Sequence, residues 1–136
     1  MIDSQKRIER ARISLEGLTV GDNFGETFFI GFAGFNDKNM SLEELIANRE
    51  LATTDWFWTD DSQMAFSVFN ILKTFGEIDQ YALAQSFADR YEVNRGYGSG
   101  MHQLLQRFRL GEIWHKAAPT LFEGQGSWGN GSCGVN

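Results

Sequence analysis

A threonine and two consecutive aspartates, Thr59-Asp60-Asp61, stand directly before a strongly apolar segment of this chain. Hydroxyl and carboxylate oxygens are the ligands that hard cations such as Mg²⁺ prefer. The same residue types also favour a helix N-terminus, where they accept hydrogen bonds from free backbone N–H groups and face the positive end of the helix dipole. Helix capping and metal binding are therefore both open interpretations of this segment.

The spacing of these residues bears on both interpretations. Asp60 is followed three positions later by Gln63, a pattern that resembles a capping box with Asp60 as the cap. Inside a regular helix adjacent side chains point about 100° apart, so neighbouring aspartates converge on one ion only where the backbone is still irregular. A helix entrance meets that condition. Three ligands do not fill an octahedral Mg²⁺ shell, so waters or other segments must complete it.

A second candidate site lies in the glycine-rich segment near the end of the sequence, where five of the 15 glycines fall between Gly124 and Gly134. Successive glycines allow backbone N–H groups to converge on an anion, and Ser127 and Asn130 offer side-chain donors. A flexible linker explains the glycines equally well, although Trp128 and Asn130 are unusual in a linker.

A third segment, Arg95-Gly96-Tyr97-Gly98-Ser99-Gly100, has a similar composition. Its glycines, Gly98 and Gly100 among them, allow close approach of the backbone to a ligand, and Tyr97 is available for stacking. A plain turn between two helices explains the segment as well.

Helices are predicted for most of the chain. Apolar residues at three- and four-residue steps, Ile8, Ala11, Leu15 and Leu18, predict one buried stripe on a first helix over 4–20, which Gly21-Asp22-Asn23 then breaks or closes. Further helices are predicted from Ser41 and over 60–75, 79–91, 101–110 and 112–118. The segment 28–35 is predicted as a loop or a short strand. The expected fold is an all-α bundle whose central helix begins at the candidate metal ligands.

Composition narrows the functional classes. The 136 residues fit a single domain, and 42% apolar content supports a real core. A formal net charge of −6 argues against a nucleic-acid partner, because phosphate binding needs a basic patch. No apolar run approaches the ~18 residues that a membrane span needs. The single cysteine, Cys133, cannot form an internal disulfide, and we expect a cytoplasmic protein.

Four segments, taken in this order, resemble motifs of the ADP-ribosylglycohydrolase family. They are Gly17-Leu18-Thr19-Val20-Gly21-Asp22-Asn23-Phe24-Gly25, Trp58-Thr59-Asp60-Asp61-Ser62-Gln63-Met64-Ala65, Arg95-Gly96-Tyr97-Gly98-Ser99-Gly100 and Ser127-Trp128-Gly129-Asn130-Gly131-Ser132. The second is close to the family's Trp-Thr-Asp-Asp-Thr-x-Met, and the last matches its Ser-x-Gly-Asn-Gly. The resemblance spans nearly the whole chain.

This resemblance implies an all-α hydrolase that cleaves ADP-ribose from modified side chains with two Mg²⁺ ions. Thr59, Asp60 and Asp61 would hold metal, and Asp60 and Asp61 would thereby take part in catalysis. Glu26 is a weaker candidate for a catalytic base, because a solvated loop position explains it as well. The residues implied to bind the ADP-ribosylated substrate are Gly98, Gly100, Ser127, Trp128, Gly129, Asn130 and Gly131.

The sequence also departs from the family pattern. The family's second metal motif, Asp-x-Asp-Thr/Ser, is absent, and so is the Met-Arg that usually follows Gly-Asn-Gly. We therefore expect residues 1–136 to be the N-terminal portion of a single domain, weakly active or inactive alone. A non-catalytic module that binds ADP-ribose or a nucleotide is the alternative. Half a helical fold would leave apolar surface unmatched, which predicts a homo-oligomer or a second chain that supplies the missing half.

Overall fold

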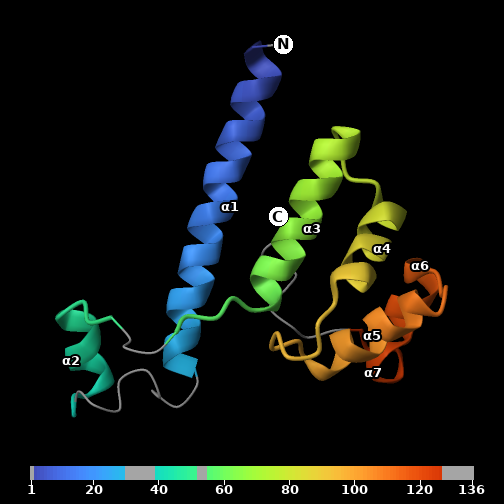
Figure 1. Ribbon diagram of the computed structural model, residues 1–136. Helices are drawn as coiled ribbons and strands as arrows, with labels where there is room; N and C mark the ends of the chain where they lie inside the picture. Colours follow the sequence, from blue (N-terminus) through green and yellow to red (C-terminus); the bar gives the residue numbers. More distant parts are fainter. Residues whose placement is uncertain (1, 30–38, 52–54, 127–136) are drawn as a thin grey trace.

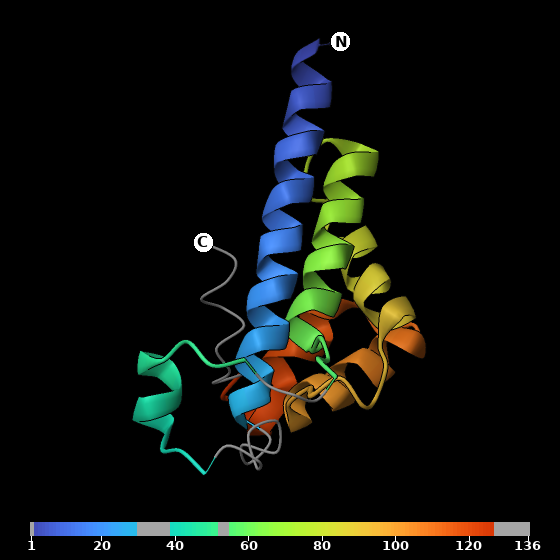
Figure 2. The same cartoon turned by 60° about the vertical axis from the view of Figure 1, so that its left-hand side comes forward.

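The computed structural model describes residues 2–29, 39–51 and 55–126, and every regular element in these ranges is a helix (Figures 1 and 2). The elements are α1 (Ile2–Phe29), α2 (Leu42–Ala47), α3 (Asp60–Phe75), α4 (Gln80–Arg90), α5 (Ser99–Arg109), α6 (Trp114–Ala117), the 3-10 helix η2 (Ala118–Thr120) and α7 (Leu121–Gly124). The predicted all-α class is confirmed. No helix in the described ranges is both long enough and apolar enough to span a bilayer.

Apart from α2, the helices pack against one another in chain order. Helix α3 runs antiparallel to α1 and packs against it on one side, with α4 on its other side (Figures 1 and 2). Helix α5 packs on α4, and α6 and α7 pack on α5. The core lies in this second half, between α4, α5 and the short C-terminal helices. Its buried apolar residues are Ala88, Tyr91, Tyr97, Leu104, Leu105, Phe108, Ala117 and Leu121.

Local sequence signals set several helix ends where they were predicted. Ser41 and Glu44 form a complete capping box at the start of α2. Helix α3 ends at Gly76, whose φ of 79° is a left-handed conformation that glycine adopts without strain. Asp79 caps α4 by accepting the N–H groups of Tyr81 and Ala82, both at 2.9 Å. The predicted loop over 95–100 is shorter than expected, because Ser99 and Gly100 already belong to α5.

Helix α1 is longer than predicted. It continues through Gly21-Asp22-Asn23 to Phe29, so the predicted break is wrong. A helical glycine costs only about 1 kcal/mol relative to alanine, and packing on α3 over the same stretch can offset that. Phe28 and Phe29, predicted as loop or strand, are the end of this helix, and the rest of that segment lies outside the described residues.

The predicted buried stripe on α1 is only partly buried. Ala11 and Leu15 are half-buried, whereas Ile8 and Leu18 are 42% and 44% exposed. The opposite face of the helix also carries apolar side chains, and Ile13 and Val20 are more than half exposed there. Within the described residues α3 is the main partner of α1, so one helix covers a stripe that was expected to face a full core.

Candidate active site at the N-terminus of α3

The N-cap residue of α3 is Thr59, not Asp60. Thr59 has an extended backbone, and its hydroxyl accepts a hydrogen bond from the Asp61 N–H at 3.3 Å. The predicted Asp60–Gln63 capping box is therefore wrong. Gln63 does not reach back to the helix start, because its side-chain oxygen is already occupied by Tyr97 and by the Glu92 N–H. Asp60 is thus the first residue of the helix, and its carboxylate is left free of a capping role.

A carboxylate from another helix binds the entrance of α3. Asp22 on α1 accepts the Thr59 N–H at 2.8 Å and the Thr59 hydroxyl at 2.6 Å. It also accepts the Ser62 hydroxyl at 2.6 Å and the Ser62 N–H at 3.3 Å. Free N–H groups at a helix N-terminus favour such an anion. The continuation of α1 past Gly21 is what brings Asp22 to this position.

The connection between α4 and α5 flanks the site on another side. The carbonyl of Arg95 accepts the Asp60 N–H at 2.6 Å. The Arg95 guanidinium lies 3.5 Å from the centre of the Trp58 ring, donates to the Trp58 carbonyl at 3.2 Å, and pairs with Glu92 at 2.9 Å. The positively charged group beside the site, the Arg95 guanidinium, is therefore already engaged by Trp58 and Glu92. Asp60 and Asp61 are not among the ion pairs found between described side chains.

Buried polar contacts hold this connection in place. The Tyr97 hydroxyl donates to the side-chain oxygen of Gln63 at 2.8 Å, and both side chains are buried. Gly96, the residue before Tyr97, also lies at the site, and its φ is 86°. A Cβ atom built on Gly96 would lie 3.6 Å from Oδ1 of Asp60, so the loop and this carboxylate are close neighbours.

Four carboxylates concentrate negative charge here: Asp22, Glu26, Asp60 and Asp61. Partial burial raises the pKa of Asp60, and repulsion from Asp61, Asp22 and Glu26 raises it further. Burial and then the charge of Asp22 raise the pKa of Asp61. The same two causes raise the pKa of Glu26. Glu26, Asp60 and Asp61 are therefore harder to ionise than they would be in water, because burial and then the neighbouring negative charges disfavour their ionised forms.

The oxygen-rich donor set suits a hard cation. Hydroxyl and carboxylate oxygens are the preferred ligands of Mg²⁺, and a bound cation would relieve the repulsion that raises the three pKa values. Within the described ranges, however, no three His, Cys, Asp or Glu residues are placed closely enough to hold a metal by themselves. The residues fit a cation whose coordination is completed by water or by further ligands.

The structure brings the predicted metal ligands together and places Glu26 near them. Thr59, Asp60 and Asp61 lie together at the α3 entrance, and Glu26 interacts electrostatically with Asp60. Glu26 is a half-buried residue of α1, so the loop position considered for it is wrong. Its placement follows from the extension of α1, which puts Glu26 one turn beyond Asp22 on the same face.

The predicted substrate residues are only partly described. Gly98 is the N-cap of α5, and no atom lies within 4 Å of the position that a Cβ would take there, so this glycine borders open space. Gly100 is buried, and a Cβ there would lie 2.8 Å from the ring of Phe122. Packing thus already explains the small residue at 100. Ser127, Trp128, Gly129, Asn130 and Gly131 lie outside the described residues.

Sequence reasoning did not assign three residues that organise the site. The sequence predicts Asp22 within a helix break and within a family-like segment, Gln63 within a capping box, and Arg95 within a loop. The spacing of Asp22 and Glu26 over one helical turn is the signal that could have indicated two acidic groups on one helix face. The contacts of Gln63 and Arg95 depend on tertiary packing and leave no local pattern.

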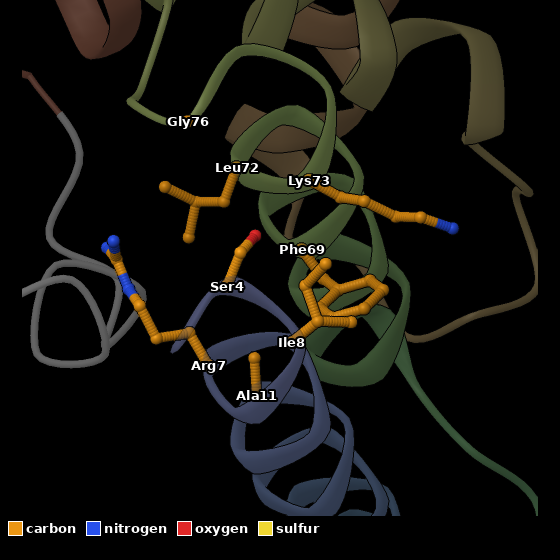
Figure 3. A pocket seen from close by; sticks show the side chains of 8 residues that line it. All are labelled: Ser4, Arg7, Ile8, Ala11, Phe69, Leu72, Lys73 and Gly76. Carbon is orange, nitrogen blue, oxygen red and sulfur yellow. The ribbon is translucent and has the colours of Figure 1, made fainter. Parts of the chain in front are cut away.

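A groove of about 260 Å³ lies at the other end of the α1–α3 pair (Figure 3). Its apolar floor includes Ile8, Ala11, Phe69 and Leu72, and Arg7 and Lys73 point outward from opposite sides. Because α1 and α3 are antiparallel, the groove is separated from Asp60 by most of the length of α3. It is not part of the carboxylate site.

Comparison with known proteins agrees with this geometry. Residues 3–134 match the family described as ADP-ribosylglycohydrolase. The chain belongs to the ADP-ribosylglycohydrolase family. Because the match covers almost every residue, both the Asp22 region of α1 and the α3 entrance lie within the family domain.

Curated relatives in the ADP-ribosylglycohydrolase family are considerably longer than this chain. It is 32% identical to ADP-ribosylhydrolase ARH3 of Danio rerio over 133 residues, which cover 91% of this chain and 35% of that protein. It is 27% identical to ADP-ribosylhydrolase ARH3 of Xenopus tropicalis over 139 residues, covering 92% of this chain and 37% of the relative. The chain thus spans little more than a third of these relatives. No solved structure matches it.

Proposed function

We propose that this chain carries part of the active site of a hydrolase that removes ADP-ribose from a modified substrate with the help of Mg²⁺. The observation that carries the proposal is the group of carboxylates at the α3 entrance, whose pKa values are raised by burial and mutual repulsion. Family membership supports the choice of substrate. A purely structural helix cap would not require this concentration of negative charge.

In this proposal Thr59, Asp60 and Asp61 hold the cation. When bound, Mg²⁺ would supply polarisation of the ribose hydroxyls and activation of water. Thr59 and Asp60 are suited to this role because the Asp22 carboxylate and the Arg95 carbonyl fix the backbone on which they stand. The waters that complete the shell, or ligands from further polypeptide, account for the sparse protein donor set.

Glu26 is proposed as an acid–base group. Its raised pKa means that it holds a proton more strongly than an exposed glutamate, which moves it toward the working range of a general acid or base at neutral pH. Glu26 belongs to α1 and not to the α3 entrance, but it is close enough to Asp60 to raise the pKa of that group. Gly98, Gly100 and the segment Ser127–Gly131 remain the residues predicted to bind ADP-ribose.

Release of ADP-ribose from an ADP-ribosylated protein tests the proposal. Hydrolysis should depend on Mg²⁺ and should disappear in the double variant Asp60→Ala, Asp61→Ala. We expect the chain alone to be weakly active, because two aspartates and a threonine do not complete two metal sites. Hydrolysis that persists in the double variant would show that these residues are not the metal ligands.

A second candidate function is ADP-ribose binding without hydrolysis. It is favoured by the finding that no three acidic, histidine or cysteine side chains in the described part of the chain converge on one point. Thermal stabilisation by ADP-ribose, with no turnover in the presence of Mg²⁺, would support this function over the first.

We also propose that the chain associates with a second copy or with another chain through the outer face of α1. Ile13 and Val20 are 55% and 60% exposed on this face, whereas the opposite face packs on α3. Light scattering should detect the association, and Val20→Lys should reduce it. A monomer at all accessible concentrations would contradict self-association.

A further inference from the structure

Asp22 accepts hydrogen bonds from two residues of the α3 entrance, Thr59 and Ser62. A carboxylate has about four lone-pair sites and no donor. Oδ1 accepts the Thr59 hydroxyl, and Oδ2 accepts the Thr59 N–H, the Ser62 N–H and the Ser62 hydroxyl. Four donors thus occupy this one carboxylate. Three of these donors share Oδ2, which is fully occupied, whereas Oδ1 accepts the Thr59 hydroxyl alone.

We propose that Asp22 is a positioning residue that fixes the direction of the Thr59 hydroxyl proton and leaves a lone pair of that oxygen free for a cation. The inference rests on the proposed function, because it assigns Thr59 as a ligand. It assigns to Asp22 itself no direct contact with metal or substrate.

The direction of the Thr59 proton follows from the chemistry of its partners. Since an ionised carboxylate can only accept, the 2.6 Å contact requires the Thr59 hydroxyl to donate toward Asp22. The hydroxyl oxygen then has two lone pairs on its remaining sides. One accepts the Asp61 N–H at 3.3 Å, and the other is available. A hydroxyl group otherwise rotates to suit its surroundings, so without Asp22 its proton is free to point toward the cation.

Ser62 fixes the orientation of Asp22 in turn. Its side chain is fully buried, and its hydroxyl lies 2.6 Å from Oδ2 of Asp22. The two backbone N–H groups that face Oδ2 cannot reverse their polarity, whereas hydroxyl groups can. Oδ2 of Asp22 must therefore accept the two backbone N–H groups. Oδ1 is left to accept the Thr59 hydroxyl and so to fix the direction of its proton.

The substitution Asp22→Asn tests this assignment with little change of shape. The amide oxygen must face the two backbone N–H groups, which places the amide NH₂ group opposite the Thr59 hydroxyl. That contact then reverses, since the NH₂ group donates and the Thr59 oxygen accepts. We expect Mg²⁺ affinity, measured by calorimetry on the folded chain, to fall by about 10- to 100-fold, the usual effect of losing a group that orients a ligand.

Asp79→Asn is the matched control. Asp79 also accepts two backbone N–H groups at a helix N-terminus, but it belongs to α4 and does not contact Thr59. It should leave Mg²⁺ affinity unchanged. Equal losses in the two variants would assign the effect to helix capping and overturn the proposal, and so would unchanged affinity in Asp22→Asn.

Amide hydrogen exchange without metal gives a second, independent measurement. Thr59 and Ser62 N–H groups should be protected in the original chain and in Asp22→Asn, and should lose protection in Asp22→Ala. Fast exchange of both amides in the original chain would overturn the proposal. Protection that depends on Asp22, together with no heat on adding Mg²⁺, would instead support positioning by Asp22 and reject the metal site of the proposed function.

Discussion

Asp22 and Thr59 are joined by two hydrogen bonds, one to the backbone N–H and one to the hydroxyl, although 37 residues separate them in the sequence. This link makes the α1–α3 contact part of the site. The residue that anchors α1 on α3 also sets the geometry of a proposed metal ligand. Stability of the α1–α3 pair and cation binding should therefore respond together to changes at this contact.

Removing one negative charge should stabilise the chain when metal is absent. Asp60→Asn relieves the repulsion that raises the pKa of Asp60, so its melting temperature in EDTA should exceed that of the original chain. Mg²⁺ at 100 times its Kd should stabilise the original chain by about 2.7 kcal/mol and the variant much less. Asp79→Asn should instead leave the melting temperature in EDTA nearly unchanged, because asparagine caps a helix about as well as aspartate. A lower melting temperature for Asp60→Asn in EDTA would contradict this prediction.

Acidification should stabilise the metal-free site. The pKa values of Glu26, Asp60 and Asp61 are raised in the folded chain, so their ionised forms oppose folding. This penalty is fully present above the folded pKa values and vanishes below the unfolded values of about 4. The stability gained by Asp60→Asn, followed by urea unfolding in EDTA, should shrink steadily as the pH falls from 7. A gain that grows on acidification would have the wrong sign.

Much of the architecture could be predicted from local sequence. Local signals set several helix boundaries as predicted. The Ser41–Glu44 capping box begins α2, and Gly76 ends the apolar helix that follows Thr59. Gly21 and the polar residues Asp22 and Asn23 instead suggested a helix break that the structure does not contain. Their weak helix propensity is offset by the contact of Asp22 with α3, a term that depends on residues far along the chain.

The site itself shows the same division. Thr59, Asp60 and Asp61 could be predicted as metal ligands because their residue types suit a hard cation and because they match a family motif. Gln63 could not be assigned correctly, since its partners Tyr97 and the Glu92 N–H come from the connection between α4 and α5. A single sequence gives the residue types at both ends of such a contact without indicating that they meet.

Gln63 and Tyr97 should contribute unequally to stability. Tyr97→Phe removes one donor, and Gln63 still accepts the Glu92 N–H, so the free energy of unfolding should fall by about 0.5–1.5 kcal/mol. Gln63→Leu leaves both the buried Tyr97 hydroxyl and the Glu92 N–H without their acceptor, and each can cost about 1–3 kcal/mol. Urea unfolding of the two variants compares them directly. Equal losses would mean that the Glu92 contact contributes nothing.

Two neighbouring glycines, Gly96 and Gly98, should respond to alanine to different degrees. Gly96 has a φ of 86°, so Gly96→Ala should reduce the free energy of unfolding by about 1–2 kcal/mol, although an added Cβ has ordinary van der Waals room beside Asp60. Gly98 has a negative φ of −66° and open space around it, so Gly98→Ala causes no backbone strain and should reduce stability less than Gly96→Ala, through the poorer helix cap alone. If Gly98 borders the substrate, as the family resemblance implies, its alanine variant should still weaken ADP-ribose binding. Thermal unfolding with and without ADP-ribose separates these effects. Undiminished stabilisation of Gly98→Ala by the ligand would remove Gly98 from the binding site, while a loss of stability in that variant without ligand as large as that of Gly96→Ala would show that its role is in the fold.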